Sequence, residues 1–422
     1  MASAYRTMEA GELRAHYQAL CRRIDAADAI IKAFVPGTFD RQRVASQVEG
    51  CLERFPEPST RPPLFAVPVG IKDIFHCEGF TTRCGSRLPP ELFQGPEAET
   101  VARLKAAGAV VMGKTATTEF AYFAPAATRN PVNPAHTPGG SSSGSAAGVA
   151  AGFFDYALGT QTVGSVIRPA AYCGVVGFKP SRGRVSTDGV VPFSVTVDHV
   201  GVFCPSPGAL AAVMAVLDSS WQPSPAPAGL RLGIPRGPYL DQADDRALVA
   251  FEAQVRRLAG AGIAIVDVPV LGDIRAVNAR HNELIAAEIA RVHAPWFEAH
   301  RDLYRQKTRA IIINGQAVDE TALARLRSSC TTLRRALLGA MRTAGIEAFA
   351  CPATTGEAPA GLDATGSPLM NLPWTHAGLP VVSLPAGAGP GGLPLGLQLA
   401  GGFDLDERLT ATAVALAPLL AD

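Results

Sequence analysis

The sequence predicts an α/β fold, with a mostly parallel sheet that is covered by helices on both faces. Two observations lead to this prediction. A helix over residues 99–107 leads into the apolar strand AVVMG, and strands at 230–235 and 262–270 flank a helix at 247–259. Continuous Val- and Ile-rich strands that alternate with helices are typical of sheets buried on both sides. The chain has 422 residues, 47% of them hydrophobic, which is enough for one large core.

The first 60 residues are expected to form helices that pack on this core. Apolar residues recur at helical spacing between about residues 9 and 34. The Pro-rich FPEPSTRPP at 55–63 then ends any helix, and the run LFAVPVGI that follows predicts a buried strand ending at Lys72. We therefore place the main domain at 60–422, since no long linker interrupts it.

Residues 275–345 differ from the rest of this domain. They are helical in pattern and rich in Arg and Glu, and they contain Trp296, His293 and His300. They could form a cap that shapes a substrate pocket, or they could be plain surface helices. The sequence leaves both interpretations open.

Charge and composition exclude several classes of protein. Lys and Arg number 38 against 37 Asp and Glu, a net charge of +1, which argues against a nucleic-acid or anionic-membrane surface. No uninterrupted apolar run reaches the length of a membrane span, and the charged N-terminus does not resemble a signal peptide, so we expect a cytoplasmic protein. The eight scattered cysteines predict reduced core thiols, and no cluster with metal-ligand spacing occurs.

The segment PGGSSSGSAAGVAAG at 138–152 is the most unusual part of the chain. Glycines allow close backbone approach, and the start of the small-residue helix that follows would stabilise negative charge. A flexible linker is the plain alternative, but linkers do not usually continue into an Ala-rich helix. GSSSG at 140–144 fits the GxSxG nucleophile elbow, yet the Pro-rich residues before it cannot form the strand that an elbow requires.

A second Gly- and Ser-rich segment at 157–186 contains Ser165, a candidate nucleophile. A serine hydroxyl needs a base, and no His stands at a familiar triad spacing. A buried lysine can serve, because desolvation disfavours its charged form and lowers its pKa. Lys72, at the end of the strand run, is such a candidate, although it could equally pair with the neighbouring Asp73.

Together these motifs resemble the amidase signature family. Lys72 in VGIKD, Ser141 in GGSSSGS and Ser165 in GTQTVGS are accompanied by further blocks in the family's order. These blocks are RLKAAGAVVMGKTATTEFA at 103–121, RNPVNP at 129–134, CGVVGFKPSRGRVS at 173–186, NLPWTHAGLPVVSLP at 371–385 and GLPLGLQLAG at 392–401. The resemblance covers most of the chain.

The resemblance implies a hydrolase of linear amides, with a Ser–cisSer–Lys triad on one α/β domain that has a mixed central sheet. Ser165 would attack the amide carbonyl, Ser141 would relay the proton after a cis peptide bond, and neutral Lys72 would be the base. Ser142 would support the lysine by a hydrogen bond. Backbone N–H groups would form the oxyanion hole, which is preorganised to stabilise developing charge, from Thr162, Val163, Gly164 and Ser165.

Two departures from the commoner family wording GTDTGGSIR bear on the substrate. Gln161 replaces the Asp and Val163 replaces a Gly, and the arginine stands three residues after the nucleophile, as Arg168, instead of two. This wording resembles malonamidase-like members, in which the arginine grips a substrate carboxylate. A small carboxylate-bearing amide such as malonamate is therefore expected, with Arg168 as anchor and Thr160 and Gly140 also contacting substrate. The alternative is a structural Arg168 paired with a buried acid.

Other functions remain open on the sequence. The A subunit of the tRNA-dependent amidotransferase uses the same triad with partner chains, and other members of the family hydrolyse other amides, carbamates or biuret-derived carboxylates. A protein of a different class, a binding protein on the same scaffold, would have no need of an unpaired buried lysine. We expect a small-molecule amide as the ligand, no cofactor and no metal, no nucleic-acid or membrane partner, and a possible homodimer by analogy.

Overall fold

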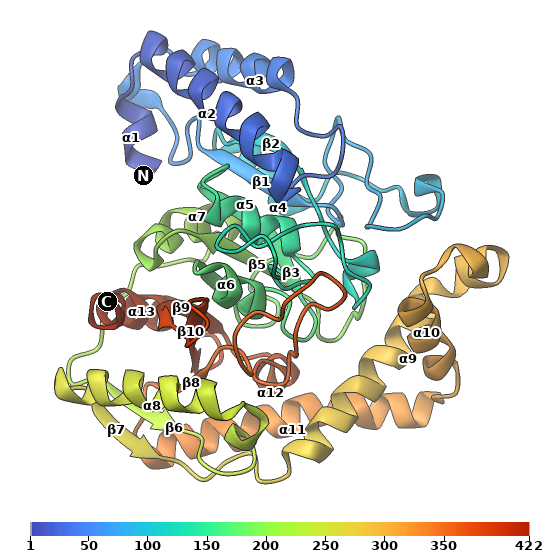
Figure 1. Ribbon diagram of the computed structural model, residues 1–422, viewed down its shortest axis with the longest axis vertical. Helices are drawn as coiled ribbons and strands as arrows, with labels where there is room; N and C mark the ends of the chain where they lie inside the picture. The colour runs from blue at the N-terminus through green and yellow to red at the C-terminus, as the bar shows by residue number, and fades with distance from the viewer. Residues whose placement is uncertain (1, 422) are drawn as a thin grey trace.

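The computed structural model describes residues 2–421, which form one α/β domain around a ten-stranded sheet (Figure 1). The order of the strands across the sheet is β2-β1-β3-β5-β4-β9-β10-β8-β6-β7. The strands are β1 (Pro68–Lys72), β2 (Val110–Thr115), β3 (Tyr156–Gln161), β4 (Val176–Lys179), β5 (His199–Cys204), β6 (Arg231–Ile234), β7 (Ala264–Asp267), β8 (Ala348–Pro352), β9 (Val381–Ala388) and β10 (Pro394–Gly401).

Thirteen α-helices are described in residues 2–421, and six short 3₁₀ helices join them. The α-helices are α1 (Ala2–Thr7), α2 (Ala10–Ile31), α3 (Arg41–Arg54), α4 (Glu99–Ala106), α5 (Ser143–Ala150), α6 (Ile167–Cys173), α7 (Leu210–Leu217), α8 (Asp245–Gly260), α9 (Ile274–His300), α10 (Gln306–Gln316), α11 (Glu320–Ala344), α12 (Leu372–Ala377) and α13 (Asp406–Leu420). None of the helices in this part of the chain is both long and apolar enough to cross a membrane.

The sheet is mixed, as expected. Parallel pairs lie in its two flanks, where β2, β1 and β3 run together and β8, β6 and β7 run together. The central neighbours, from β3 through β5, β4, β9 and β10 to β8, are all antiparallel. The parallel strand pairing that the sequence predicts is therefore found in the two flanks of the sheet. Strands β1 to β5 are buried along their whole length.

The N-terminal helices continue into the sheet. Helices α2 and α3 lie over the β2 end of the molecule (Figure 1), and the segment that joins them pairs with β2 through Phe34 and Thr115. Gly113 of β2 leaves room for this segment, because a Cβ there would lie 2.9 Å from the Phe34 ring. The first 60 residues thus pack on the core through an extra bridge to the sheet.

The small residues of α5 allow the helix to lie very close to the sheet. A Cβ on Gly148 would be 2.1 Å from the Phe154 ring, and one on Gly70 of β1 would be 2.6 Å from the same ring. The Ala- and Gly-rich sequence is therefore a packing requirement. It brings the N-terminus of α5 close to the end of β1.

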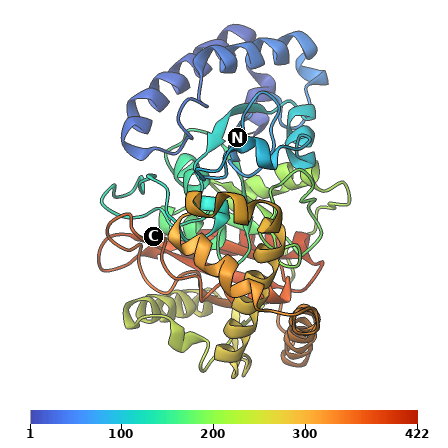
Figure 2. The same cartoon turned by 90° about the vertical axis from the view of Figure 1, so that its right-hand side faces the viewer.

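Helices α9, α10 and α11 form the predicted helical region. Figures 1 and 2 show α9 and α10 standing at one side of the sheet, while α11 returns beneath it. Aromatic contacts join α9 to the loops that follow β1 and β2, since Trp296 packs on Phe93 and His293 on Phe120. These helices therefore cover the loop side of the domain.

Candidate active site

Lys72 ends β1 in the interior and has only hydroxyl partners. Its side chain is 0% exposed. Its Nζ lies 2.8 Å from Ser141 Oγ and 2.7 Å from Thr160 Oγ1. Burial lowers the pKa of Lys72 well below its ordinary value, and the negative charge of Asp198 acts in the opposite direction. The neutral amine is the form that such a site favours.

The alternative partner of Lys72, Asp73, binds another lysine. Asp73 Oδ1 lies 2.9 Å from Lys114 Nζ, and both side chains are buried. Asp73, the first residue after β1, also accepts the N–H of Arg83 at 3.3 Å. Asp73 is therefore engaged by Lys114, while Lys72 contacts Ser141 and Thr160.

The three serines after Gly140 have different surroundings. The peptide bond between Gly140 and Ser141 is cis. The carbonyl of Ser141 accepts the N–H of Thr118 at 3.2 Å, and Ser143 Oγ donates to the carbonyl of Gly139 at 2.8 Å. Ser141 is held by its backbone, while its hydroxyl remains turned to Lys72.

Ser142 and Thr160 have contacts that differ from those expected. Ser142 Oγ bonds to the backbone N–H and carbonyl of Thr160, each at 3.3 Å, and not to the lysine. The hydroxyl of Thr160 accepts the hydrogen bond from Lys72 that was expected for Ser142. Ser142 therefore supports Lys72 indirectly, and the Thr160 hydroxyl is engaged by the lysine, not left free for substrate.

Gln161 closes the turn that carries Ser165. Its Oε1 accepts the N–H groups of Val166 at 2.8 Å and Ile167 at 3.0 Å, at the start of α6. Its Nε2 donates to Thr375 Oγ1, which in turn donates to the carbonyl of Val163. The Gln161 amide therefore fixes the 162–165 segment from two sides. It can do so because a neutral amide has an oxygen that accepts and an NH₂ group that donates.

Ser165, 7% exposed, lines a small cavity with Ser141. The remaining walls are Ala121, Tyr122, Phe123, Thr162, Val163, Arg168 and Phe193. The cavity has a volume of about 10 Å³, roughly the space of one water molecule. The rings of Tyr122 and Phe193, both in its wall, stack on each other with centroids 5.5 Å apart. The site is therefore narrow and closed by aromatic side chains.

Arg168 reaches the same cavity from α6 and has no acidic partner among the described residues. It is 2% exposed and donates to the carbonyls of Gly140 at 2.6 Å and Gly366 at 2.8 Å, and to Thr365 Oγ1 at 3.2 Å. Its Nε has no hydrogen-bond partner in this part of the chain. Burial lowers the pKa of Arg168 to about 10, which leaves it charged at neutral pH. The backbone of Gly140 therefore binds Arg168 itself.

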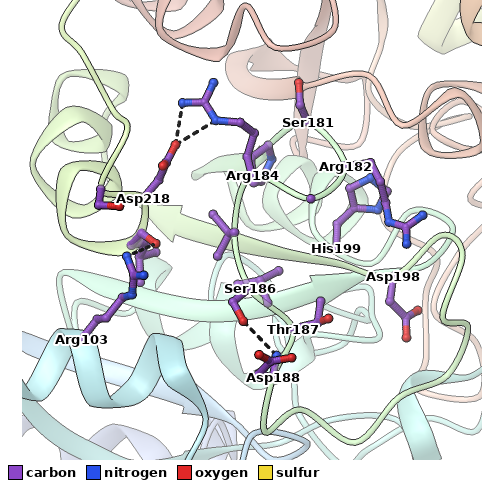
Figure 3. A pocket seen from close by; sticks show the side chains of 16 residues that line it. Arg103, Ser181, Arg182, Arg184, Ser186, Thr187, Asp188, Asp198, His199 and Asp218 are labelled. Carbon is purple, nitrogen blue, oxygen red and sulfur yellow. Dashed lines mark hydrogen bonds and ion pairs between the residues drawn. The ribbon is translucent and has the colours of Figure 1, made fainter.

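Asp198 lies on the far side of the nucleophile segment. Its Oδ1 accepts the Thr162 hydroxyl at 2.6 Å, and its Oδ2 accepts the N–H groups of Phe193 and Ser194. Figure 3 shows Asp198 and His199 at the edge of a second, mainly polar cavity of about 420 Å³. Asp198 therefore lines this second cavity and bonds to Thr162, a wall residue of the cavity that Ser165 lines.

Lys72, Ser141 and Ser165 meet at one place, but the sequence analysis missed residues around them. Gln161, Thr375 and Asp198 bond to the segment that carries Ser165, and Asn371 packs against Gly164, where a Cβ would lie 2.4 Å from its Oδ1. Gln161 was visible as a departure from the family wording. The others lie far from Ser165 in sequence, and no local pattern distinguishes them. Within residues 2–421, no group of three or more His, Cys, Asp or Glu is arranged to hold a metal.

Comparison with known proteins settles the family. Residues 15–410 match the sequence profile of the Amidase family. The chain belongs to this family. The A subunit of the glutamyl-tRNA(Gln) amidotransferase of Synechococcus sp. (strain WH7803) is 32% identical, over 95% of this chain and 92% of that protein. The corresponding protein of Anaeromyxobacter sp. (strain K) is 34% identical, over 91% and 88%.

Solved structures agree with this assignment. An amidase crystal structure superposes with a TM-score of 0.89 at 27% identity, covering 98% of this chain and 97% of the other. The peptide amidase of Stenotrophomonas maltophilia gives 0.82 at 25% identity, covering 97% and 94%. The protein is thus an amidase signature hydrolase that acts on amides.

Proposed function

We propose that this amidase cleaves small carboxamides that bear a carboxylate, through an acyl-enzyme on Ser165. Ser165 Oγ attacks the carbonyl carbon and gives its proton to Ser141, whose own proton passes to the lone pair of neutral Lys72. The proton then returns along this path to the leaving nitrogen as the C–N bond breaks. Water attacks the ester by the same route and releases the acid.

The contacts of Lys72 support its role as the base. A neutral amine can donate one proton to Thr160 Oγ1 while its lone pair accepts the Ser141 hydroxyl, and both oxygens lie within 2.8 Å. The backbone N–H groups of the 162–165 segment are the proposed oxyanion hole. Gln161 and Thr375 hold this segment without a charge, so the developing oxyanion meets no repulsion from the residue that replaces the usual Asp.

The buried, acid-free guanidinium of Arg168 carries the substrate proposal. A buried charge is costly unless a countercharge or several hydrogen bonds compensate it. Arg168 has three neutral acceptors, an unpartnered Nε and a place in the wall beside Ser141 and Ser165. A substrate carboxylate would supply the missing charge. The alternative of a structural arginine paired with a buried acid has no acidic partner in residues 2–421 to support it.

Ammonia release from malonamate and from malonamide tests this proposal. The two compounds have nearly the same shape and differ in charge. We expect malonamate to have at least about tenfold higher kcat/KM, equal to about 1.4 kcal/mol of transition-state discrimination. Ser165→Ala is the blank. Arg168→Met should abolish the preference, whereas Arg129→Met, which removes an arginine outside the cavity, should retain it. Equal losses on both substrates in Arg168→Met would contradict the anchor.

The similarity to amidotransferase A subunits supports a second candidate function, release of ammonia from glutamine within a complex. These relatives match over more than nine tenths of the chain. The isolated protein decides between the two. Turnover of malonamate without any partner chain favours the first function, whereas glutaminase activity that appears only with partner chains favours the second.

A further inference from the structure

We propose that Glu288 of α9 is a positioning residue for the reaction, because it holds the segment 193–198 that fixes the oxyanion segment. This inference rests on the proposed function of residues 162–165. It assigns the helical region 275–345 a part in catalysis that does not depend on which substrate is cleaved.

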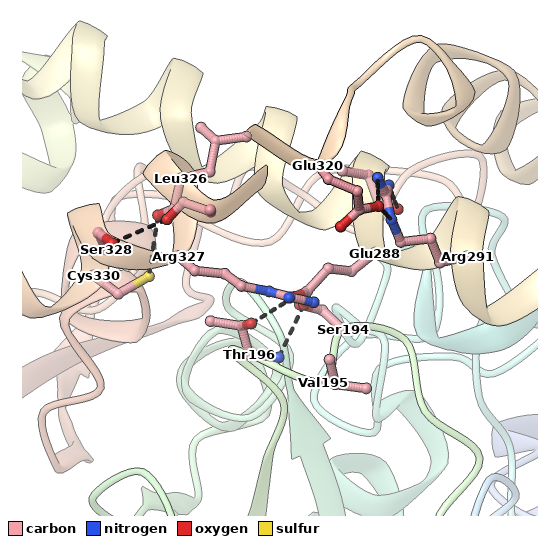
Figure 4. Close-up of polar contacts among 12 residues, drawn as sticks. Ser194, Val195, Thr196, Glu288, Arg291, Glu320, Leu326, Arg327, Ser328 and Cys330 are labelled. Carbon is pink, nitrogen blue, oxygen red and sulfur yellow. Dashed lines mark hydrogen bonds and ion pairs between the residues drawn. The ribbon is translucent and has the colours of Figure 1, made fainter. Parts of the chain in front are cut away.

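Glu288 is a buried carboxylate whose four hydrogen bonds join two elements. It is 1% exposed. Its Oε2 accepts the Ser194 hydroxyl at 2.5 Å and the Thr196 N–H at 2.9 Å, and its Oε1 accepts the Thr196 hydroxyl at 2.5 Å. Arg327 of α11 completes the set with its Nε at 2.7 Å (Figure 4). The carboxylate is therefore fully bonded, and three of its four bonds go to the 193–198 segment.

The same segment carries the groups that touch the active site. Phe193 stacks on Tyr122 in the wall of the Ser165 cavity. Phe193 and Ser194 also donate their N–H groups to Asp198, at 2.7 and 2.9 Å. Asp198 in turn accepts the Thr162 hydroxyl. An unbroken series of hydrogen bonds therefore runs from α11 through Glu288 and Asp198 to the first residue of the oxyanion segment.

The charges in this series explain why a carboxylate stands at position 288. The Thr196 N–H at Oε2 and the Arg327 Nε–H at Oε1 can only donate, so both oxygens of residue 288 must accept, as a carboxylate does. Arg327 supplies the countercharge that makes burial of Glu288 tolerable. A glutamine would keep the shape, but its NH₂ group would face a donor and leave the segment less well held.

The first experiment measures how fast a fluorophosphonate labels Ser165. In this reaction Ser165 Oγ forms a bond to phosphorus, fluoride leaves, and the serine proton passes to the Ser141–Lys72 pair. Labelling uses the oxyanion segment but no substrate carboxylate. We expect Glu288→Gln to slow labelling at saturating reagent by at least about tenfold, with little change in the half-saturating concentration, because misplaced oxyanion donors act on the chemical step.

Glu320→Gln is the matched control. Glu320 lies on α11 and pairs with Arg291 of α9 at 2.5 Å (Figure 4), but its side chain is 78% exposed and it does not join the 193–198 segment through any described contact. It should label at the wild-type rate. Thermal unfolding of each variant separates lost folding from lost positioning.

A double-mutant cycle tests the route itself. Thr162→Val removes the hydroxyl at the far end of the series. If Glu288 acts through this hydroxyl, the double variant labels about as slowly as the slower single variant. The proposal would be overturned if the double variant lost labelling rate by the product of the two single effects. It would also be overturned if Glu288→Gln lost no more labelling rate than its loss of folded protein explains. A wild-type protein whose Ser165 does not label would contradict the proposed function itself, whereas labelling without malonamate turnover would contradict only the substrate.

Discussion

Two buried lysines on neighbouring strands have opposite surroundings. Lys72 of β1 and Lys114 of β2 both have fully buried side chains, and the register places them one residue apart along the paired strands. Lys114 Nζ binds the Asp73 carboxylate at 2.9 Å and the Thr82 hydroxyl at 3.0 Å. Lys72 has two hydroxyl partners and no carboxylate within hydrogen-bond distance in the described chain. On the proposed function, the partner and not burial alone decides whether such a lysine is structural or acts as a base.

The largest effect is expected from Lys72→Met. A general base contributes about 10²–10⁴-fold to rate, so kcat should fall by about a thousandfold. The methionine fills nearly the same volume and buries no charge, so the midpoint of thermal unfolding should not fall. Ammonia release and differential scanning calorimetry measure the two quantities. A Lys72→Met variant that stays active, or that loses activity only because it unfolds, would contradict the role of Lys72 as the base.

Lys114→Met is expected to show the reverse pattern. It leaves Asp73 buried without its countercharge, and breaking a buried pair in this way costs about 3–5 kcal/mol of stability. Urea denaturation measures this loss, while kcat of the folded fraction should change little. The double variant Asp73→Asn with Lys114→Met should recover part of the stability, because no lone charge remains. Loss of activity at unchanged stability would contradict the structural role.

Lys179 offers a third case, a buried lysine that, within residues 2–421, donates only to the carbonyls of Pro180 and Leu379. Burial lowers its pKa to about 7 in the folded protein, against 10.5 for an ordinary lysine. Between these values the unfolded chain holds a proton that the folded one lacks, so this lysine makes stability rise with pH, by up to about 1.4 kcal/mol per pH unit. This gain in stability is complete above the pKa of Lys179 in the unfolded chain. It is lost as the pH falls to the pKa in the folded protein.

Urea unfolding at pH 7 and pH 9 measures this dependence. The wild type should gain more stability between the two values than Lys179→Met does. Equal gains in the two proteins would show that Lys179 keeps its proton, and that carbonyl partners alone can hold a buried ammonium.

The smallest effect concerns the pH profile of Asp198→Asn. The negative charge of Asp198 raises the pKa of Lys72, and the thiol of Cys84 acts in the same direction when ionised. Burial raises the pKa of Cys84, which keeps that thiol neutral, so Asp198 is the charge that matters near neutrality. Removing it lowers the pKa of Lys72, and the acid limb of kcat/KM should move to lower pH. An acid limb that does not move would show that the charge of Asp198 does not affect the pKa of Lys72.

Lys72, Ser141 and Ser165 could be proposed from the sequence because they stand in local motifs. Lys72 ends a strand run, and Ser141 and Ser165 each stand in a Gly- and Ser-rich turn. The flanking helix and strand units were predicted for the same reason, since each has its own periodicity. The helix at 247–259, for example, is observed as α8 (Asp245–Gly260).

What could not be predicted depends on contacts between distant segments. The antiparallel centre of the sheet follows from pairings such as β4 with β9, whose strands are some 200 residues apart, and no single strand indicates its partner. Thr160 was expected near substrate, because its spacing from Ser165 is visible but the direction of its hydroxyl is not. Glu288 resembles any other acid of an Arg- and Glu-rich helix until the fold brings Ser194 and Thr196 to it.

The pH dependence of Ser165 labelling by a fluorophosphonate tests the central claim that Lys72 is a neutral base. This measurement is independent of substrate ionisation. A base whose pKa lies well below 10.5 predicts a labelling rate that reaches its plateau well below that pH, and a Lys72→Met variant without that titration. A rate that rises tenfold per pH unit up to about pH 10 in the wild type, as for a lysine of ordinary pKa, would contradict the account.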